Sequence, residues 1–415
     1  MFDSLSEIFS VLKQNKLRAI MTGFSVAWGI FMLLILLGSG KGLENGMRFN
    51  FRGSATNSIW VNSGETTQSH EGYKEGRRIQ FTNEDYTAIK NEISGISNLS
   101  GRVYLYDSAP LTYKDNFGVY QITCVMPAFF GIEKMDIIKG RFINDIDIKE
   151  SRKVIVLSQP IVDTLFDGDE PLGAYIKVGG IPYKVVGVFR DVMQRDERKS
   201  FMPITTGQKV FGQGNRIQNF AITTASESLE ENRAIEKEVR HLLARRHRFS
   251  QTDQGAIFIW NTLENFRQVL GVFTGIRIFI WIIGIMTIIA GIVGVSNIMI
   301  ILVKERTKEI GIRKSIGASP WSVIKLVMSE SLLITALSGF FGLLAGMGVL
   351  HFANMILQSI AAGNPDINSY FHNPSADFQV AVTATFVLVI SGLIAGFIPA
   401  KKAAAIKPIE ALHDE

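Results

Sequence analysis

The chain has 415 residues, of which 47% are hydrophobic and 20% are charged. Its formal net charge of +5 is small, whereas a nucleic-acid-binding protein concentrates basic residues on one face, so composition gives that class no support. Four segments of 22, 26, 35 and 23 residues, at 19–40, 278–303, 331–365 and 378–400, contain no charged residue. Because about 20 apolar residues cross a bilayer as a helix, the chain cannot be a single soluble domain.

The first predicted element lies before the first charge-free segment. Ser4 and Glu7 have the spacing of a capping box, and apolar residues recur at helical spacing from Leu5 to Leu12. We expect residues 1–18 to form a cytoplasmic amphipathic helix on the inner membrane surface. Simple anchoring and contact with a cytoplasmic partner explain this helix equally well.

The charge-free segments predict four transmembrane helices, at 19–40, 278–303, 326–357 and 378–400. Lys and Arg cluster before the first helix, between the second and third, and after the fourth, but the segment 358–377 carries none. Basic residues favour the cytoplasmic side, so the loop 304–325, the tail 401–415 and both termini are predicted to be cytoplasmic. Residues 358–377 become a short external loop, and 41–277 a large external region.

The external region contains patterns of both strands and helices. Strands are expected at 58–62, 119–126, 153–157, 175–178 and 183–189, and helices at 83–93, 229–248 and 263–277, the last leading into the second span. Gly179-Gly180-Ile181-Pro182 predicts a hairpin turn, and the polar stretch 63–76 a mobile loop. Cys124 is the only cysteine, so no intrachain disulfide supports this region. The predicted fold class is therefore an α-helical membrane protein with four transmembrane helices and a large α+β extracytoplasmic domain inserted between helices 1 and 2.

Small residues recur at four-residue spacing in the last two predicted spans. They are Ser338, Gly342 and Gly346 in the third span and Gly392 and Gly396 in the fourth. This spacing favours close helix packing in lipid, either within the chain or against a second copy. Asn297 is a polar residue inside the second span, and we expect it to have an interhelical hydrogen-bond partner rather than a transport role.

The segment 38–42 invites comparison with a nucleotide-binding loop. In the pattern G-x-x-x-x-G-K-[S/T], backbone N–H groups cradle phosphate, but here Ile35 occupies the first glycine position and Gly42 the Ser/Thr position. We interpret 38–42 as a flexible exit from the first helix. The six histidines are scattered without the spacing of a zinc motif. The sequence therefore predicts no catalytic residues, no metal site and no directly bound cofactor.

The cytoplasmic loop 304–320 has the densest local signals in the chain. It predicts a short charged helix that continues from the second span and ends near Gly317, with Ser319 as the N-cap and Pro320 as the first residue of the next helix. Ile310 would offer a small apolar contact among charged neighbours. Paired charges and a capped break indicate a rigid helix held against a protein rather than a solvated loop.

Three sets of motifs in this chain resemble one known family. They are Gly294-Val295-Ser296-Asn297-Ile298-Met299 with 305–314 and Ile316-Gly317-Ala318; the ending G-x-x-P-A-x-x-A-A at 396–404 with Pro408-Ile409-Glu410-Ala411-Leu412; and, more loosely, Tyr183-Lys184-Val185-Val186-Gly187-Val188 with Met202-Pro203-Ile204. Together with the order of one span, a large external domain and three further spans, they are similar to the FtsX/MacB/LolC permease family of ABC transporters.

The resemblance implies a permease subunit of the bacterial inner membrane that transmits ATP-driven movement of cytoplasmic ATPase domains to the external domain, a process called mechanotransmission. It implies that the ATPase-coupling residues are Glu305, Arg306, Thr307, Lys308, Glu309, Ile310, Gly311, Ile312, Arg313, Lys314, Gly317 and Ala318. No ATPase is fused in this sequence, so we expect a separate cytoplasmic ATPase subunit that uses ATP and Mg²⁺. A second permease copy or a paralogue is the other expected partner.

The resemblance leaves three functions open. The favoured one is MacB-like export of a periplasmic peptide, toxin or drug, with a possible periplasmic adaptor and outer-membrane channel. The second is LolC-like lipoprotein release. The third is FtsX-like activation of a cell-wall hydrolase without transport, for which the external domain is larger than expected.

Overall fold

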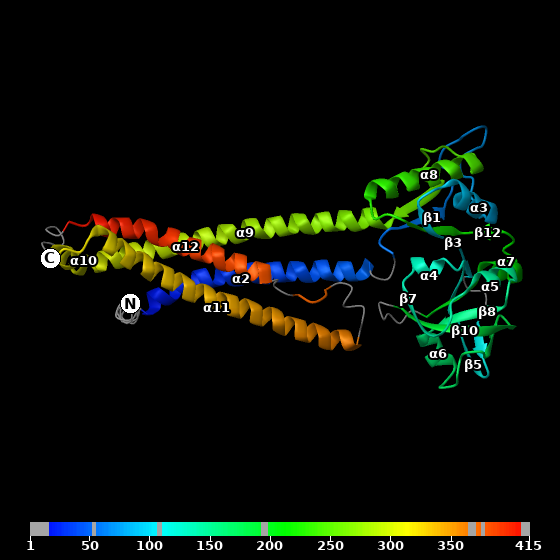
Figure 1. Ribbon diagram of the computed structural model, residues 1–415, viewed down its shortest axis with the longest axis horizontal. Helices are drawn as coiled ribbons and strands as arrows, with labels where there is room; N and C mark the ends of the chain where they lie inside the picture. The colour runs from blue at the N-terminus through cyan, green and yellow to red at the C-terminus, as the bar shows by residue number, and fades with distance from the viewer. Residues whose placement is uncertain are drawn as a thin grey trace. The chain divides into compact units, whose positions relative to one another are not determined.

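The computed structural model describes residues 16–51, 55–105, 110–191, 198–363, 371–374 and 378–407. The chain divides into two compact units, one made of Met1–Met47 with Gly271–Glu415 and the other of Arg48–Leu270. The first unit consists of long helices and the second is an α+β domain (Figure 1). Most of the helix predicted at 1–18 lies outside the described residues.

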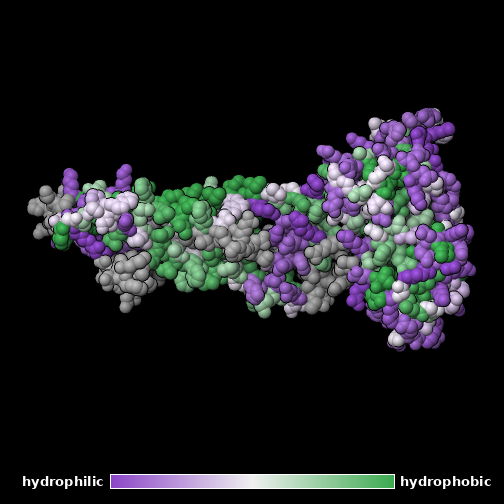
Figure 2. Space-filling view, in the orientation of Figure 1, coloured by the Kyte–Doolittle hydropathy of each residue, from purple (hydrophilic) through white to green (hydrophobic). Residues whose placement is uncertain are grey.

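In the residues that the structure describes, the helical unit has five elements. They are α2 (Lys16–Asn50), α9 (Thr262–Glu305), α10 (Thr307–Ser315), α11 (Pro320–Gly363) and α12 (Phe378–Ala405). Among the described residues, three helical segments are long and apolar enough to cross a membrane, namely Gly23–Asn50, Thr262–Glu305 and Pro320–Ile360. Figure 2 shows hydrophobic residues gathered around the middle of this unit. The fourth predicted span corresponds to α12, a helix of 28 residues that is not among these three.

Helix α2 continues without a break through 38–42, so the prediction of a flexible exit there is wrong. The glycines serve close packing instead. A Cβ atom on Gly38 would clash with the side chain of Leu350 in α11, and one on Gly42 would lie 2.7 Å from Cζ of Phe371. The backbone N–H of His372 also donates to the carbonyl of Gly42 at 3.0 Å. These residues therefore let α2 approach its neighbours closely.

The α+β unit contains one large mixed sheet and a small two-stranded one. In the described part of the chain, the large sheet has 12 strands in the order β14-β1-β13-β3-β6-β11-β8-β10-β9-β4-β5, with β7 also paired to β10; β12 and β2 form the small sheet. The strands are β1 (Ser58–Ser63), β2 (Phe81–Thr82), β3 (Ile96–Leu105), β4 (Leu111–Tyr113), β5 (Asn116–Gly118), β6 (Gln121–Val125), β7 (Met135–Gly140), β8 (Val154–Ser158), β9 (Tyr175–Val178), β10 (Ile181–Asp191), β11 (Lys199–Pro203), β12 (Arg216–Ile217), β13 (Asn219–Thr224) and β14 (Ile257–Asn261).

The helices described in this unit are α3 (Asn83–Glu92), α4 (Phe129–Ile132), α5 (Asp145–Lys149), α6 (Gln159–Leu165), α7 (Ile204–Val210) and α8 (Leu229–His247). The large sheet is covered on both faces. Phe220 of β13 packs in one core with Ile89 of α3 and Leu243 of α8, whereas its neighbour Ala221 packs in a second core with Phe129 of α4. Successive side chains of a strand point to opposite faces, so β13 contributes to two cores.

The five predicted strands correspond to β1, β6, β8, β9 and β10, and the predicted helices to α3, α8 and the start of α9. The predicted hairpin turn is shorter than expected. Gly179 and Gly180 have φ of 54° and 83°, and Ile181 already pairs with Val178. A two-residue turn with positive φ at both positions matches the twist of the flanking strands, so Ile181 and Pro182 belong to β10.

The stretch 63–76 is held in place, contrary to the prediction of a mobile loop. The carboxylate of Asp253 accepts hydrogen bonds from the backbone N–H of Thr67 at 2.8 Å and of Gln68 at 3.1 Å, and from the Thr67 hydroxyl at 2.7 Å. Burial alone would raise the pKa of Asp253, but these hydrogen bonds outweigh it and hold the pKa below its usual value. The loop is thus anchored by a residue far away in sequence.

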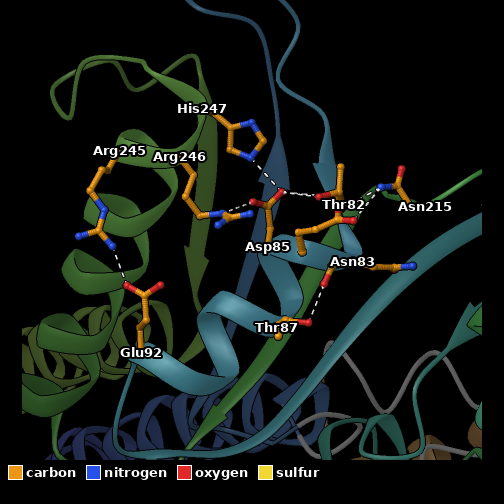
Figure 3. A network of polar contacts seen from close by, with 10 residues as sticks. Thr82, Asn83, Asp85, Thr87, Glu92, Asn215, Arg245, Arg246 and His247 are labelled. Carbon is orange, nitrogen blue, oxygen red and sulfur yellow. Dashed lines mark hydrogen bonds and ion pairs between the residues drawn. The ribbon is translucent and has the colours of Figure 1, made fainter.

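A buried carboxylate joins α3 to α8 (Figure 3). Asp85 forms a capping box with the N-cap Thr82 and accepts hydrogen bonds from Arg246 Nε at 2.6 Å and His247 Nε2 at 2.9 Å. Burial raises the pKa of Asp85, but the bonds from His247 and Arg246 outweigh it, so the pKa lies below its usual value. Among the described residues, no group of three or more His, Cys, Asp or Glu side chains could hold a metal. The bonds from Arg246 and His247 to Asp85 hold the start of α3 against the end of α8.

Candidate functional site

The candidate site is centred on α10, which lies at one end of the helical unit where α9, α11 and α12 come together (Figure 1). Only Arg306 separates α9 from α10. Its N–H donates to Leu302 O at 3.1 Å, and its carbonyl accepts from Ile310 N at 3.0 Å, so helical hydrogen bonding continues across the break. The Thr307 hydroxyl donates to the carbonyls of Val303 and Lys304, a kind of bond that bends helices.

The predicted end of this short helix is confirmed. Gly317 has φ of 103°, its N–H donates to Lys314 O at 3.1 Å, and the N–H of Ala318 donates to Arg313 O at 3.0 Å. These two bonds form a Schellman motif, which terminates helices at a glycine. Ser319 then accepts a hydrogen bond from Ser322 N at 3.3 Å, and α11 begins at Pro320 as predicted.

Ion pairs among arginine and glutamate side chains brace α10 and join it to α11. Arg306 donates to Glu330 of α11 at 3.1 Å and 3.4 Å and to Glu309 at 2.9 Å and 3.3 Å. Arg313 donates to Glu309 at 3.1 Å. Hydrogen bonds from Arg306 and the positive charges of Arg306 and Arg313 lower the pKa of Glu309 despite its partial burial. Glu309 is therefore ionised at neutral pH.

Glu330 is a functional candidate that the sequence analysis missed. Its side chain is almost completely buried, and the Arg306 guanidinium supplies its opposite charge. A sequence signal existed, because Glu330 is the last charged residue before the 35-residue charge-free segment. A carboxylate at that position needs a partner when it is buried, and Arg306, 24 residues earlier, supplies it.

Lys314 ties α10 to the end of α12. Its Nζ donates to the carbonyls of Ala404 at 2.8 Å and Ile406 at 2.7 Å. The last carbonyls of a helix have no partner within the helix, so a lysine at this place satisfies them and complements the helix dipole. Helix α10 is thus fixed to α9, α11 and α12 together.

The placement of Ile310 differs from the prediction. Ile310 is only 6% exposed and packs with Val303, Val323, Val327 and Ala403 at the ends of the four helices. Gly311 is buried beside it. Ile310 therefore anchors α10 to its own chain instead of offering a contact to another protein. Four of the predicted ATPase-coupling residues are exposed, namely Glu305, Lys308, Ile312 and Gly317.

The predicted helix-packing glycines lie between helices of the same chain. A Cβ atom on Gly342 would clash with the carbonyl oxygen of Ala27 in α2, and one on Gly346 would lie 3.0 Å from Leu34. In α12, a Cβ atom on Gly392 would lie 3.1 Å from the side chain of Thr335 in α11. A Cβ atom on Gly396 would lie 2.8 Å from the side chain of Ser331, also in α11. These glycines therefore pack α2 and α12 against α11.

Asn297 does not have the interhelical partner that the sequence predicts. Its side chain is exposed on α9, and no hydrogen bond to it occurs within the described part of the chain. Its neighbours Val295 and Met299 instead face the cluster at the helix ends. The face of α9 that carries Asn297 is thus turned away from this chain's own helices.

Comparison with known proteins identifies the family of this chain. Residues 19–242, more than half of the chain, match the family model of the MacB-like periplasmic core domain. The chain belongs to the MacB-like permease family. Residues 281–408, which include α10, α11, α12 and the second half of α9, match the FtsX-like permease C-terminal family. A MacB-like permease is a membrane protein of the ABC transporter type, so the resemblance noted in the sequence is confirmed.

Several curated proteins are similar to this MacB-like permease along its whole length. The "Macrolide export ATP-binding/permease protein MacB" of Bdellovibrio bacteriovorus is 25% identical over 100% of this chain and 62% of the relative; the protein of the same name from Acinetobacter baylyi is 24% identical over 100% and 60%. The chain thus spans about three fifths of these MacB relatives. The "Uncharacterized ABC transporter permease YknZ" of Bacillus subtilis is 26% identical over 100% of both chains.

Two solved structures are similar to about half of the MacB-like permease. The extracellular domain of YknZ is 20% identical, with 49% of this chain and 100% of that chain covered and a TM-score of 0.42. The periplasmic region of MacB from Actinobacillus actinomycetemcomitans is 20% identical, with 54% and 96% covered and a TM-score of 0.44.

Proposed function

We propose that this chain is the permease subunit of an ABC transporter that couples ATP hydrolysis by a separate cytoplasmic ATPase to movement of its external domain. In this proposal α12 is the fourth transmembrane helix, both termini and α10 face the cytoplasm of a bacterium, and Arg48–Leu270 lies outside the inner membrane. Two permease chains, identical or paralogous, act together. ATP and Mg²⁺ bind only to the ATPase.

The observation that carries the proposal is the attachment of α10 to three other helices. It is nearly continuous with α9, it is paired to α11 through Arg306 and Glu330, and it is bonded to α12 through Lys314. A helix held at three points transmits a push as a rigid body, whereas a solvated loop would absorb it. Since α9 is a single helix of 44 residues starting at Thr262, directly after β14, displacement of α10 acts on the strand that enters α9.

The cargo we propose is a periplasmic substrate such as a peptide, toxin or drug, exported with a periplasmic adaptor and an outer-membrane channel. The observation that favours export is the similarity to MacB relatives, whose names describe macrolide export. LolC-like lipoprotein release and FtsX-like activation of a cell-wall hydrolase are the alternatives, and the large external unit favours the first of these over the second.

The test is purification of the tagged full-length chain in a gentle detergent, followed by mass spectrometry and measurement of ATP hydrolysis. We expect an ABC-type ATPase to be retained. The variant Glu309→Arg should insert normally into the membrane but lower the retained ATPase activity about tenfold, equivalent to about 1.4 kcal/mol of lost interaction. If wild type retains no ATPase, or if Glu309→Arg keeps full coupling, the proposal fails. Co-purification of an adaptor, a lipoprotein chaperone or a hydrolase distinguishes the three proposed functions.

A further inference from the structure

Exposed lysines lie at the ends of the three long helices that meet beside α10. They are Lys304 of α9, Lys325 of α11, and Lys401 and Lys402 of α12. Within the part of the chain that the structure describes, no acidic side chain pairs with their ammonium groups. We call these four residues the lysine belt. Its charge is therefore available to a ligand from outside the chain.

The lysine belt lies at one level of the helical unit. One buried apolar cluster joins the three helices at this level, and its members include Val303, Val323, Val327, Ala400 and Ala403. Lys304 directly follows the member from α9, and Lys325 lies between the two members from α11. Lys401 and Lys402 lie between the two members from α12. Because the members pack together, the lysines beside them share a level, and their exposure places them on the outside of the unit.

Exposed apolar side chains lie one helical turn from the lysine belt. On α12, Phe397 is 56% exposed and Ile398 is 54% exposed. Each of them precedes a lysine of the belt by four residues, and residues four apart are neighbours on a helix surface. Ile301 of α9 is also exposed, three residues before Lys304. Apolar side chains on the outside of a spanning helix face acyl chains, so the belt lies where the hydrocarbon region ends.

Trp321 marks the same boundary on α11. It is 62% exposed at the second position of this helix, four residues before Lys325. Tryptophan gathers at the membrane–water interface, because its ring is apolar and its N–H group is polar. Figure 2 shows hydrophilic residues beyond the hydrophobic band at this end of the unit. Trp321 and the lysine belt therefore lie at the level of lipid headgroups.

Few carboxylates of the described chain compensate the lysine belt. The acidic residues in the segments 302–331 and 395–407 are Glu305, Glu309 and Glu330. The last two already pair with Arg306 and Arg313, so their negative charge is neutralised by arginines. Positive charge therefore exceeds negative charge at this end of the unit, and a negatively charged headgroup complements it.

We propose that the lysine belt binds the phosphate groups of anionic phospholipids in the membrane leaflet at this end of the unit. The ligand is a lipid rather than free phosphate because the belt adjoins exposed apolar side chains, such as Phe397 and Ile398, that acyl chains cover. Bound headgroups fix the depth of these helix ends in the membrane. The inference goes beyond ATPase coupling and rests on the proposed function only in taking α12 as a spanning helix.

The test adds phosphatidylglycerol or phosphatidylcholine to the full-length chain in gentle detergent and measures bound lipid by native mass spectrometry. We expect wild type to prefer the anionic phosphatidylglycerol. Lys401→Gln combined with Lys402→Gln should lower phosphatidylglycerol binding about tenfold or more, because each lysine near an anionic headgroup contributes about fivefold. The control, Lys74→Gln combined with Lys90→Gln, removes the same charge from exposed positions of the α+β unit and should change binding less than about twofold.

Equal binding of the two lipids by wild type overturns the inference, and so does an equal loss in both double variants, which reflects net charge alone. If an equimolar amount of inorganic phosphate displaces phosphatidylglycerol, the belt is a site for free phosphate and the inference is also overturned. Equal thermal midpoints show that the variants are folded, and Lys325→Gln replaces the double variant if its midpoint falls. Failure of the proposed function is recognised separately, by the absence of an ABC ATPase from the wild-type preparation.

Discussion

The guanidinium of Arg306 donates to both carboxylate oxygens of Glu330, at 3.1 Å and 3.4 Å, across 24 positions of sequence. Arg306 is the single residue between α9 and α10, and Glu330 is buried in α11. The pair therefore joins the break between two helices to the body of a third. Any force on α10 reaches α11 through this contact without passing through the flexible backbone of a loop.

Removing one partner of this pair should be strongly destabilising. Arg306→Ala leaves the Glu330 carboxylate buried without its guanidinium, which we expect to cost about 3–5 kcal/mol and to lower the thermal midpoint of the purified chain. The double variant Arg306→Leu with Glu330→Leu leaves no buried charge and should recover most of that loss. A single variant as stable as wild type would show that the pair contributes little.

Gly317 should not tolerate a side chain. Its φ of 103° lies in the region that glycine adopts readily, so Gly317→Ala should cost about 1–2 kcal/mol and loosen the turn after α10. Limited proteolysis should then cut near residue 317 faster than in wild type. The control is Ser315→Ala, within helical backbone and exposed, which should be cut at the wild-type rate.

Two glycines of α11 allow a matched comparison of helix packing. Gly342→Ala places a methyl group against the carbonyl of Ala27 in α2, whereas Gly348→Ala meets nothing within 4 Å. We expect Gly342→Ala to destabilise the helical unit by about 1–3 kcal/mol, as overpacking does, and Gly348→Ala to leave it unchanged or slightly more stable. Equal thermal midpoints for the two variants would contradict the close approach of α2 and α11.

Acid should release the loop held by Asp253. The pKa of Asp253 is depressed in the folded domain, so its contribution to stability is present above about pH 4, near the unfolded-state value, and declines as the pH falls toward the lower folded-state pKa. Hydrogen exchange in residues 64–79, corrected for the intrinsic effect of pH, should therefore quicken in acid.

The matched variant for that experiment is Asp253→Asn. An amide cannot accept hydrogen bonds on both terminal atoms, so we expect a loss of about 2 kcal/mol and fast exchange of the loop already at pH 6. Its pH dependence should be weaker than that of wild type. Wild-type protection of the loop in Asp253→Asn at pH 6 would show that other contacts hold it.

Local signals predicted much of the fold. The N-cap Ser319, the stop at Gly317 and the Gly179-Gly180 turn each depend on a few consecutive residues, and all of them occur in the structure. The strands that the sequence analysis missed, such as β3 and β13, pair with segments far away in the chain. Their strand character depends on those partners more than on their own residues.

The sequence by itself determined that the chain enters a membrane, where α10 ends, and which family the chain resembles, because charge-free length, caps and motifs are properties of consecutive residues. Only the tertiary structure decided that Ile310 points inward, that Glu330 is the partner of Arg306, that Asn297 is exposed and that Asp253 holds the 63–76 loop. Each of these depends on which distant segments pack together. Burial and pairing are set by that packing, which no local pattern of residues records.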